Sequence, residues 1–586
     1  MIVPMKKVFV VCQAKDADGA VSDLRKLGVM HVEHQKAPQG ADILALSDDI
    51  SLAGNALDVL SQYCSREEKT KQKETRDWKL TSRHIIDTEK RLDQLKEYSR
   101  LLKVRIAEWE QWGDFDPEKI NSLSRRNIFI RFYQIPVKEI NSLPKELIIK
   151  KISVSSGIAN CAVVSKEKIE IAYKEILPPK SSLSAMKHRL EQDAKVEEAL
   201  KKDLCRHGDH YIDIERHKIT LEKELEFKQA IRGMGQSGVL SYLAGYVPID
   251  ATEKLIEASM EQKWAVSIRE PVEEDNVPTF IRTPKWVSMI KPVLGLLGIT
   301  PGYRELDVSA VFLVFFSIFF GILIGDAGYG IVYMLIAFLL RNKMRKRTGN
   351  DNIFGLFCIL SSCAIIWGVL TGTFFGQEWL RKWGFNPLLP QLNDVKFMQT
   401  FCFFLGALHL SFAHSWRAAL KFPSLTALAD IGWICVLWSS FFIARTLILG
   451  EAFPLWVKWL IITGISLVIF FTNPQRNILK TIGEGLGTVA LSLMNNFTDV
   501  VSYVRLFAVG LAGVAIAETA NVMASGLGDG AIAMIGSVLI VVIGHALNII
   551  LGPMSVLVHG VRLNVLEFSG HASVTWSGSN YEPLTE

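Results

Sequence analysis

A series of long apolar segments in the second half of the chain constrains the fold more than any other feature. Between residues 308 and 570, apolar runs of about 17 to 25 residues or more follow one another, and an α-helix needs that length to cross a bilayer. Residues 1 to about 300 are instead charged and mixed in composition. The sequence therefore predicts a soluble half followed by a polytopic membrane half.

The apolar segments predict eight transmembrane helices. The first segment, 308–340, is too long for one crossing and contains GDAGYG at Gly325 to Gly330, so we interpret it as a pair of short helices. Gly321, Gly325 and Tyr329, at intervals of four, favour close helix packing and a tight turn. The other segments are 353–375, 397–420, 428–449, 455–472, 486–524 and 531–568. The last two exceed a perpendicular span, so we expect them to tilt or to extend beyond the bilayer.

Basic residues in the loops predict the orientation. If the soluble half is cytoplasmic, the loops after even-numbered helices should be rich in lysine and arginine. These loops carry Arg341, Lys343, Arg345, Lys346, Arg347, Arg417, Lys421, Arg476 and Lys480. Arg381 and Lys382, after the third helix, weaken the pattern without reversing it. Both termini are therefore predicted to be cytoplasmic.

The soluble half begins and ends with the same pattern. A strand at 8–11, a helix at 18–27 and a strand at 29–33 form one β-α-β unit. A second unit follows much later in the chain, with elements at 240–247, 251–262 and 264–268. Two such units predict a ferredoxin-like lobe, built from residues 1–37 and 238–275 and split by a long insertion.

The insertion predicts a rod with a second lobe. Residues 41–112 and 182–233 are charged and carry apolar residues at intervals of three and four, a coiled-coil periodicity. These are Leu92, Leu95, Leu102, Ile106 and Trp109 in the first segment, and Leu200, Leu204, Tyr211, Ile214, Leu221 and Leu225 in the second. We expect the two to pair as an antiparallel hairpin. Residues 113–181 between them form a distal α/β lobe, with elements at 128–133, 137–143, 148–154, 161–165 and 169–172.

The remaining parts are a linker at 276–306, the membrane domain at 307–570 and a cytoplasmic tail at 571–586. The predicted fold class thus has two parts, an N-terminal α+β region of lobes joined by the rod and an all-α membrane domain of eight helices.

The soluble half carries no recognisable catalytic chemistry. It contains no phosphate-binding GxxxxGK[ST], no GxGxxG and no HExxH sequence. The eight cysteines include no CxxC pair, which argues against a disulfide framework or a zinc site. His207 and His210 could share a helix face, but they lack further ligands in sequence, so we interpret them as solvated or packed histidines. No cofactor, metal or nucleic acid is expected, and the chain is not expected to be an enzyme on its own.

The membrane half carries charges that need an explanation. Arg505 lies within the apolar segment 495–517, and an arginine in hydrocarbon is a functional-site candidate by default. Glu484, Thr498 and Ser502 lie on nearly the same helical face as Arg505. On the last helix a stripe at intervals of seven is formed by Asn548, Ser555 and Arg562, with His559 beside it.

Two such stripes predict a water-accessible path. The alternative, hydrogen bonds that only hold helices together, stays open, more so for the neutral side chains than for the arginines. Glu518, Asp499 and His545 lie off these stripes, and a vestibule or a helix interface suits them as well as a place on the path does. Gly510 and Gly513 near Arg505 are expected to let another helix approach closely.

Three segments carry a resemblance to a known family: FFGILIGDAGYG at 319–330, SYVRLFAVGLAGVAIA at 502–517 and HGVRLNVLEFSG at 559–570. With these segments and the same order of parts, the chain resembles subunit a, also called subunit I, of the rotary V-type and A-type ATPases. The resemblance covers essentially the whole chain.

The resemblance implies a membrane stator that couples H⁺ or Na⁺ movement to ATP hydrolysis or synthesis. Its expected partners are a rotating proteolipid ring of carboxylate-bearing hairpins, peripheral-stalk subunits of the E/G type, central-stalk-side subunits of the V1/A1 sector and membrane lipid. Arg505 corresponds to the essential stator arginine and Arg562 to its partner on the last helix. The expected location is the plasma membrane of a prokaryote.

The sequence departs from the eukaryotic pattern at two positions. Gly513 stands where those relatives carry a histidine, and Gly552 stands where they carry a glutamate, which points to the prokaryotic branch. The half-channel candidates therefore come from this chain: Glu484, Thr498, Ser502, Asn548, Ser555, His559 and Glu567. Two other functions fit the sequence less well. A secondary ion transporter with a cytoplasmic regulatory coiled-coil arm would favour inverted repeats, and none is visible. An inert membrane-anchored scaffold would leave two membrane arginines unexplained.

Overall fold

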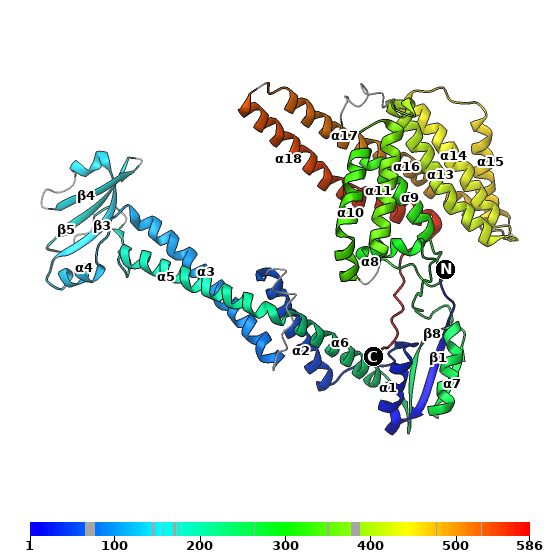
Figure 1. Ribbon diagram of the computed structural model, residues 1–586, viewed down its shortest axis with the longest axis horizontal. Helices are drawn as coiled ribbons and strands as arrows, with labels where there is room; N and C mark the ends of the chain where they lie inside the picture. The colour runs from blue at the N-terminus through cyan, green and yellow to red at the C-terminus, as the bar shows by residue number, and fades with distance from the viewer. Residues whose placement is uncertain are drawn as a thin grey trace. The chain divides into compact units, whose positions relative to one another are not determined.

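The computed structural model in Figure 1 describes the chain except residues 65–76, 143–146, 156, 168–170, 174, 263, 349–350, 377–386, 476–477 and 529, and except the side chains of 141–142, 342–348 and 478. It divides into two compact units. One contains Met1–Val8, Tyr246–Ala258 and Ser267–Pro583, and the other contains Phe9–Gly245, Ser259–Val266 and Leu584–Glu586. An N-terminal α+β region and a C-terminal helical region with several apolar helices confirm the predicted two-part layout.

The first and last segments of the soluble half form one lobe, which we call the proximal lobe, and it contains both predicted β-α-β units. The elements are β1 (Met5–Gln13), α1 (Ala17–Leu27), β2 (His31–Glu33), β8 (Leu240–Pro248), α7 (Thr252–Gln262) and β9 (Ala265–Arg269). The strand order is β2-β8-β1-β9, with β7 (Gly235–Ser237) paired to β8. Strands of the first and of the second β-α-β unit therefore alternate within one sheet, although about two hundred residues of sequence separate the two β-α-β units. Each predicted element is confirmed to within a few residues.

The insertion forms long helices, but not the two continuous helices that the sequence predicted. They are α2 (Ala41–Tyr63), α3 (Trp78–Glu110), α5 (Leu183–His207) and α6 (Tyr211–Arg232). A short 3₁₀ turn, Gly208–His210, separates α5 from α6. The N-terminus of α3 is capped by Asp77, whose carboxylate accepts hydrogen bonds from the Lys79 and Leu80 amides.

Ion pairs show how these helices run. Lys187 pairs with Glu110 at 2.7 Å and His84 pairs with Asp203 at 3.0 Å, so α3 and α5 are antiparallel as predicted. The Lys187 hydrogen bond lowers the pKa of Glu110 below its ordinary value. The α2 helix contacts α6 and also lies beside α3, where Lys96 donates to the Tyr63 hydroxyl at 3.1 Å.

This stretch therefore contains more than two helices. Its buried core is formed by residues from all four of them, including Leu60, Ile85, Leu92, Leu204 and Ile214. The expected apolar positions Leu92, Leu102, Ile106 and Trp109 are buried. The coiled-coil rod itself remains a prediction.

The distal lobe is a small antiparallel sheet beside a short helix. It contains α4 (Pro117–Ser124), β3 (Phe129–Pro136), β4 (Ile148–Ser155), β5 (Ile158–Ser165) and β6 (Glu175–Ile176), with the strand order β4-β5-β3-β6. A 3₁₀ helix, Val137–Ser142, follows β3. The strand expected at 169–172 is not observed at 171–172, and residues 168–170 lie outside the described part of the chain.

The membrane half is helical throughout its apolar segments. The helices are α9 (Ser309–Ile324), α10 (Ala327–Thr348), α11 (Asn352–Thr371), α13 (Val395–Lys421), α14 (Ala427–Leu449), α15 (Val457–Phe471), α16 (Ile478–Ser502), α17 (Val504–Ser525) and α18 (Ala531–Ser555). Within the described residues, five helical stretches are long and apolar enough to cross a membrane, and α9, α15 and the apolar part of α10 are shorter.

Eight crossings and their orientation stay predictions. The shorter helices do not settle the count, and some of the loop residues on which the orientation depends fall outside the description. Arg381, Lys382 and Arg476 are not described, nor are the side chains of Lys343, Arg345, Lys346 and Arg347.

The GDAGYG segment is a tight turn between packed helices, as predicted. α9 ends at Gly325, whose φ of +66° is readily adopted only without a side chain. Asp326 Oδ1 accepts hydrogen bonds from the Gly328 and Tyr329 amides at 2.7 and 3.2 Å and so caps α10. A Cβ at Gly368 on α11 would lie 2.0 Å from the Ala327 backbone nitrogen. The backbones of α11 and α10 therefore approach too closely at this crossing to leave room for a side chain at position 368.

Gly368→Ala should therefore destabilise the membrane half. The clash is with backbone, which no side-chain rotation can relieve, and overpacking of this kind costs about 1–3 kcal/mol or more. A Cβ at Gly483 on α16 has no atom within 4 Å, so Gly483→Ala is the matched control and should be neutral or slightly stabilising. Thermal unfolding of the purified variants in detergent is the measurement. Equal melting temperatures would contradict the packing interpretation.

Candidate functional site

A break between α16 and α17 positions Arg505. Tyr503 lies at this break, where the Leu506 amide bonds to the Tyr503 carbonyl at 3.0 Å in a three-residue turn. The Tyr503 ring is fully buried, and its hydroxyl lies 2.7 Å from His409 Nδ1. A Cβ at Gly406 of α13 would come within 2.7 Å of that ring. The backbone two residues before Arg505 is therefore held by close packing against α13.

His409 connects this break to the end of the chain's last long helix. Its imidazole is completely buried and stacks between Phe315, with ring centroids 3.9 Å apart, and Phe568, at 4.4 Å. Phe568 is the neighbour of Glu567. Helices α9 and α13, the α16–α17 break and the residues after α18 thus meet around one ring.

The helix after α18 departs from α-helical geometry. Two π-helical turns, Val556–Gly560 and Leu563–Phe568, precede the short α19 (Ser569–Ala572). Such turns shift the register of the side chains that follow and are frequent at functional sites. Asn548 is 8% exposed whereas the Arg562 side chain is 54% exposed. The first π-helical turn lies between Ser555 and Arg562, so the predicted stripe at intervals of seven does not continue in α-helical register to Arg562.

Glu567 lies between the two arginines. Its Oε1 is 3.5 Å from Arg562 Nε and 3.9 Å from Arg505 Nη1. The Glu567 side chain is only 5% exposed, and that of Arg505 is 23% exposed. Among the described residues, neither Glu567 Oε2 nor Arg505 Nη1 has a hydrogen-bond partner, although both atoms are buried. One buried carboxylate thus faces two guanidinium groups and retains capacity to bind another group.

A polar cavity leads to Glu567 from the α16 side. It has a volume of about 400 Å³ and is lined by Thr488, Ser492, Asn496, Asp499, Glu567 and His571, among others. These residues come from α16, which precedes Arg505 in the chain, and from the last helical turns. The cavity is therefore lined by hydroxyls, amides and carboxylates as far as Glu567, the carboxylate that faces both arginines.

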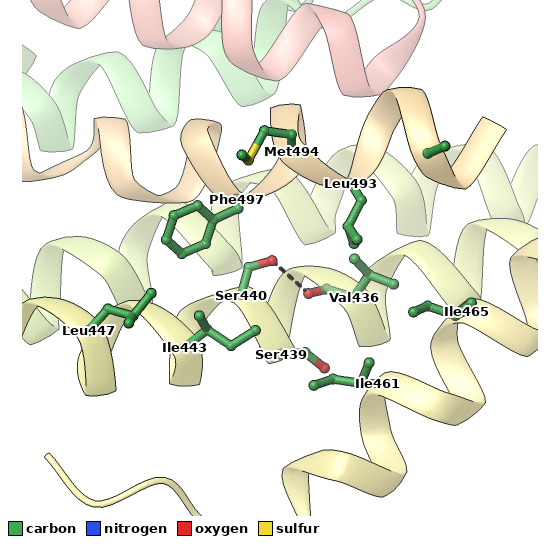
Figure 2. A pocket seen from close by; sticks show the side chains of 11 residues that line it. Val436, Ser439, Ser440, Ile443, Leu447, Ile461, Ile465, Leu493, Met494 and Phe497 are labelled. Atoms are coloured by element: carbon green, nitrogen blue, oxygen red, sulfur yellow. Dashed lines mark hydrogen bonds between the residues drawn. The ribbon is translucent and has the colours of Figure 1, made fainter. Parts of the chain in front are cut away.

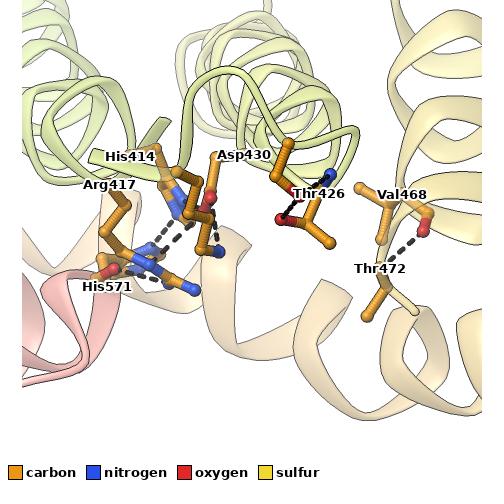
Figure 3. A network of polar contacts seen from close by, with 9 residues as sticks. His414, Arg417, Thr426, Asp430, Val468, Thr472 and His571 are labelled. Carbon is orange, nitrogen blue, oxygen red and sulfur yellow. Dashed lines mark hydrogen bonds and ion pairs between the residues drawn. The ribbon is translucent and has the colours of Figure 1, made fainter. Parts of the chain in front are cut away.

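A row of connected ionisable groups, of which His414, Asp430 and His571 are buried, lies beside this cavity (Figure 3). His571 Nδ1 lies 2.9 Å from His414 Nε2, and His414 Nδ1 lies 3.2 Å from Asp430 Oδ1. On its other side, the His571 ring places Nε2 3.1 Å from Asp499 Oδ2. Arg417 donates to the His571 carbonyl at 2.9 Å. Two carboxylates, Asp430 and Asp499, are therefore connected through two imidazoles. An imidazole can both donate and accept a proton.

A second cavity lies along α17, beyond Arg505 in the chain. It has a volume of about 260 Å³ and is lined by Tyr329, Tyr333, Gly513, Asn548, Ser555 and His559, among others. Asn548 donates to the Gly513 carbonyl at 2.8 Å, and the Tyr329 hydroxyl lies 2.6 Å from His545 Nδ1. A Cβ at Gly552 would lie 2.7 Å from Ile324 Cδ1 and 3.0 Å from the Tyr333 hydroxyl, so these two side chains occupy the space that a side chain at 552 would need.

The predicted site residues separate into two groups. Arg505, Arg562 and Glu567 come together, and Asn548, Ser555 and His559 share the second cavity. Three others do not line either cavity. Thr498 and Ser502 donate to carbonyls of their own helix, of Met494 and Asp499, and Glu484 accepts from Asn473 at 2.8 Å and from Gln475. The prediction assumed an uninterrupted α-helix, whereas the three-residue turn at Tyr503 interrupts the α-helical hydrogen bonding directly before Arg505.

Sequence reasoning missed the row of connected ionisable groups. Helical angles put Asp499 off the predicted stripes without deciding between the path and a helix interface, and His414, Asp430 and His571 are not among the candidates predicted from the sequence. For Asp499, His414 and Asp430 a signal was available, because an ionisable residue inside an apolar segment is a functional-site candidate wherever it occurs. His571 gave no such signal, because it falls in the segment predicted to be the cytoplasmic tail. The close helix approach expected at Gly510 is confirmed, because a Cβ there would lie 2.6 Å from the Ile322 carbonyl oxygen. The approach expected at Gly513 is not close, because a Cβ there would make only an ordinary van der Waals contact, 3.5 Å from Asn548.

A third cavity, of about 420 Å³, is apolar (Figure 2). It lies between α14, α15 and α16 and is lined by Val436, Ile443, Ile461, Ile465, Leu493 and Phe497, among others. The hydroxyls of its two serines, Ser439 and Ser440, donate to carbonyls of their own helix. This cavity offers an ion no ligand and is not part of the candidate site.

Comparisons with known proteins decide the family. No family model matches the chain. The V-type ATP synthase subunit I of Borreliella burgdorferi is 31% identical over 623 residues, which cover all of this chain and 99% of that protein. The chain belongs to the V-type ATP synthase subunit I family. Subunit I 1 of Treponema pallidum is 29% identical and covers the whole of both chains, and the A-type subunit I of Pyrococcus abyssi is 24% identical over 70% of this chain and 64% of its own.

Subunit I is a membrane subunit of the ATP synthase complex and is not itself catalytic, as predicted. Among solved structures, the cytoplasmic N-terminal domain of subunit I, homolog of subunit a, of V-ATPase aligns with 45% of this chain, at 13% identity and a TM-score of 0.22. That TM-score is too low to bear on the fold.

Proposed function

We propose that this subunit I is the membrane stator of a rotary V/A-type ATPase and provides two offset half-channels against a rotating proteolipid ring. The observation that carries the proposal is the buried Glu567 between Arg505 and Arg562, with a polar cavity on either side of Arg505 along the chain. The complex couples H⁺ or Na⁺ movement to ATP hydrolysis or synthesis.

The cavity with Asp499 and His571 is assigned to the cytoplasmic half-channel. Arg417, which lies beside it, and Lys421, which binds Asp430 at 2.7 Å, belong to a basic loop end that the charge pattern predicts to be cytoplasmic. The cavity with Asn548, Ser555 and His559 is then the half-channel to the opposite side. Arg505 separates the two.

The physical chemistry of Arg505 explains its role. A guanidinium stays charged at any working pH, and a fixed positive charge favours the ionised form of a ring carboxylate that passes it. The carboxylate therefore gives up its ion beside Arg505, and the same charge repels a cation that would leak between the half-channels. An ion moving through the path carries roughly 2.3 kcal/mol per 100 mV of membrane potential, which drives rotation.

Glu567 keeps the two arginines in place in this scheme. A buried carboxylate between two guanidinium groups reduces their mutual repulsion and fixes their direction. The soluble half, with its long helices and two lobes, anchors the peripheral stalks of E/G type and meets the central-stalk-side subunits of the V1/A1 sector. The complex lies in the plasma membrane of a prokaryote, with both termini of this chain cytoplasmic.

Reconstitution tests this function against the secondary-transporter alternative. The purified chain alone, in liposomes with an ion gradient, should show no ion flux above that of empty liposomes, because the mobile carboxylate belongs to the ring. The assembled complex should take up ions on addition of ATP. Gradient-driven transport by the chain alone would favour the transporter.

A further inference from the structure

Three potential metal ligands meet on the long helices of the soluble half. His84 of α3 places Nε2 3.0 Å from Oδ2 of Asp203 on α5. His207, one helical turn beyond Asp203, contributes a ring nitrogen, and the three ligand atoms all lie within 4.8 Å of one another. All three residues belong to the same compact unit. The sequence could not show this arrangement, because His84 is separated from the other two by more than a hundred residues.

The donor set suits zinc. Two imidazole nitrogens and one carboxylate oxygen are common Zn²⁺ ligands, with bond lengths of about 2.0–2.2 Å, so ligand atoms around a tetrahedral ion lie about 3.3 Å apart. The 3.0 Å separation of His84 and Asp203 is close to that value. Residues four apart on a helix project from the same face, which aims Asp203 and His207 together at α3. His84 and Asp203 are 55% and 38% exposed, so an ion can enter and water can complete its coordination.

We infer that His84, Asp203 and His207 form a Zn²⁺ site that fastens α5 to α3. The site lies where α5 ends, since the 3₁₀ turn Gly208–His210 begins directly after His207. An ion held by both helices fixes the last turn of α5 against α3, directly before the 3₁₀ turn that leads into α6. The site is remote in sequence from the membrane arginines and does not depend on the proposed transport function.

A hydrogen-bonded His84–Asp203 pair alone is the competing explanation, and it makes a different prediction. It would involve two of the three residues and leave His207 irrelevant to metal binding. Zinc also requires deprotonated imidazoles, so its binding should weaken in acid, and an ion that binds only the folded chain raises the temperature of unfolding.

Cobalt substitution tests the site. The full-length chain without a histidine tag, stripped of metal in detergent, is titrated with Co²⁺ and the visible d–d absorption is recorded. We expect one equivalent to bind, to be displaced by Zn²⁺, and to show no thiolate-to-cobalt charge-transfer band, since no cysteine is among the ligands. His84→Gln, Asp203→Asn and His207→Gln should each weaken binding by at least about tenfold, because even outer-shell partners of metal ligands are worth about 10- to 100-fold.

His188→Gln is the matched control. His188 is exposed on the same helix, outside the cluster, and its variant should bind Co²⁺ as the unaltered chain does. Helix content by circular dichroism, measured without metal, confirms that each variant is folded. Absence of stoichiometric Co²⁺ binding, a thiolate band, or undiminished binding in His207→Gln would overturn the inference. ATP-driven transport is not the readout, so failure of this site is distinguishable from failure of the stator.

Discussion

Replacing Arg505 by alanine should abolish ATP-driven ion uptake while the complex still assembles. Without the fixed charge, a ring carboxylate has no group that favours its ionised form at the stator, and the two half-channels are no longer separated. Because both functions of the charge are lost, uptake should fall at least about a hundredfold, which corresponds to about 3 kcal/mol. The measurement is ion uptake by vesicles that contain the purified complex.

Assembly should survive because little of the packing depends on the Arg505 side chain. Its ion pair with Glu567 is long, at 3.9 Å, and the backbone is held two residues earlier by Tyr503. Arg445→Ala on α14 is the matched control. This arginine also lies in the membrane half but pairs with Glu451, so its removal should leave uptake largely intact. Unchanged uptake in Arg505→Ala would refute the proposed role.

Glu567→Gln should have the second largest effect. Neutralising this buried carboxylate leaves Arg505 and Arg562 without their shared counter-charge, so they repel each other and Arg505 loses its direction. Interactions with charged partners are worth about 1.5–3 kcal/mol each, which corresponds to a decrease in ATP-driven uptake of roughly 10- to 100-fold. The glutamine has nearly the same volume as glutamate, so packing around Phe568 should not change.

A double-mutant cycle separates this effect from a general disturbance. Arg562→Ala should reduce uptake less completely than Arg505→Ala, because the Arg562 side chain is 54% exposed. If Arg562 acts through Glu567, combining Arg562→Ala with Glu567→Gln should give less than the sum of the two free-energy changes. Strict additivity, or a wild-type rate in Glu567→Gln, would mean that the carboxylate is not coupled to the arginines.

Patterns within single segments predicted much of this fold. The β-α-β units and the apolar helices follow local periodicity, so β8 and α7 could be placed within a residue or two. The break of α16 at Tyr503 could not, because it depends on the His409 bond and on the missing Cβ of Gly406, both on another helix. Helical-face reasoning across that break therefore linked Thr498 and Ser502 to Arg505, whereas their hydroxyls bond to their own helix.

The candidate site was predictable only in its charged members. Arg505, Arg562 and Glu567 were identified because charges are rare in apolar segments, but the pairing of both arginines with one carboxylate arises in the π-helical turns, which the sequence does not indicate. The contact between His414 and His571 joins residues 157 positions apart, a separation at which spacing carries no information. Which residues of the site come together depends on how the helices pack, and residue types alone do not reveal that packing.

Cross-linking to the ring tests the central claim most directly. Ala508 is exposed on α17, one turn beyond Arg505, and is replaced by cysteine in a chain whose eight native cysteines have been removed. A second cysteine is placed beside the ion-binding carboxylate of the proteolipid. If this chain is the stator, oxidation should join the two chains and stop ATP-driven uptake until the disulfide is reduced. A cysteine that replaces Trp459, which is 71% exposed on α15, should form no cross-link. No cross-link at 508, or one that leaves uptake unchanged, would contradict the account.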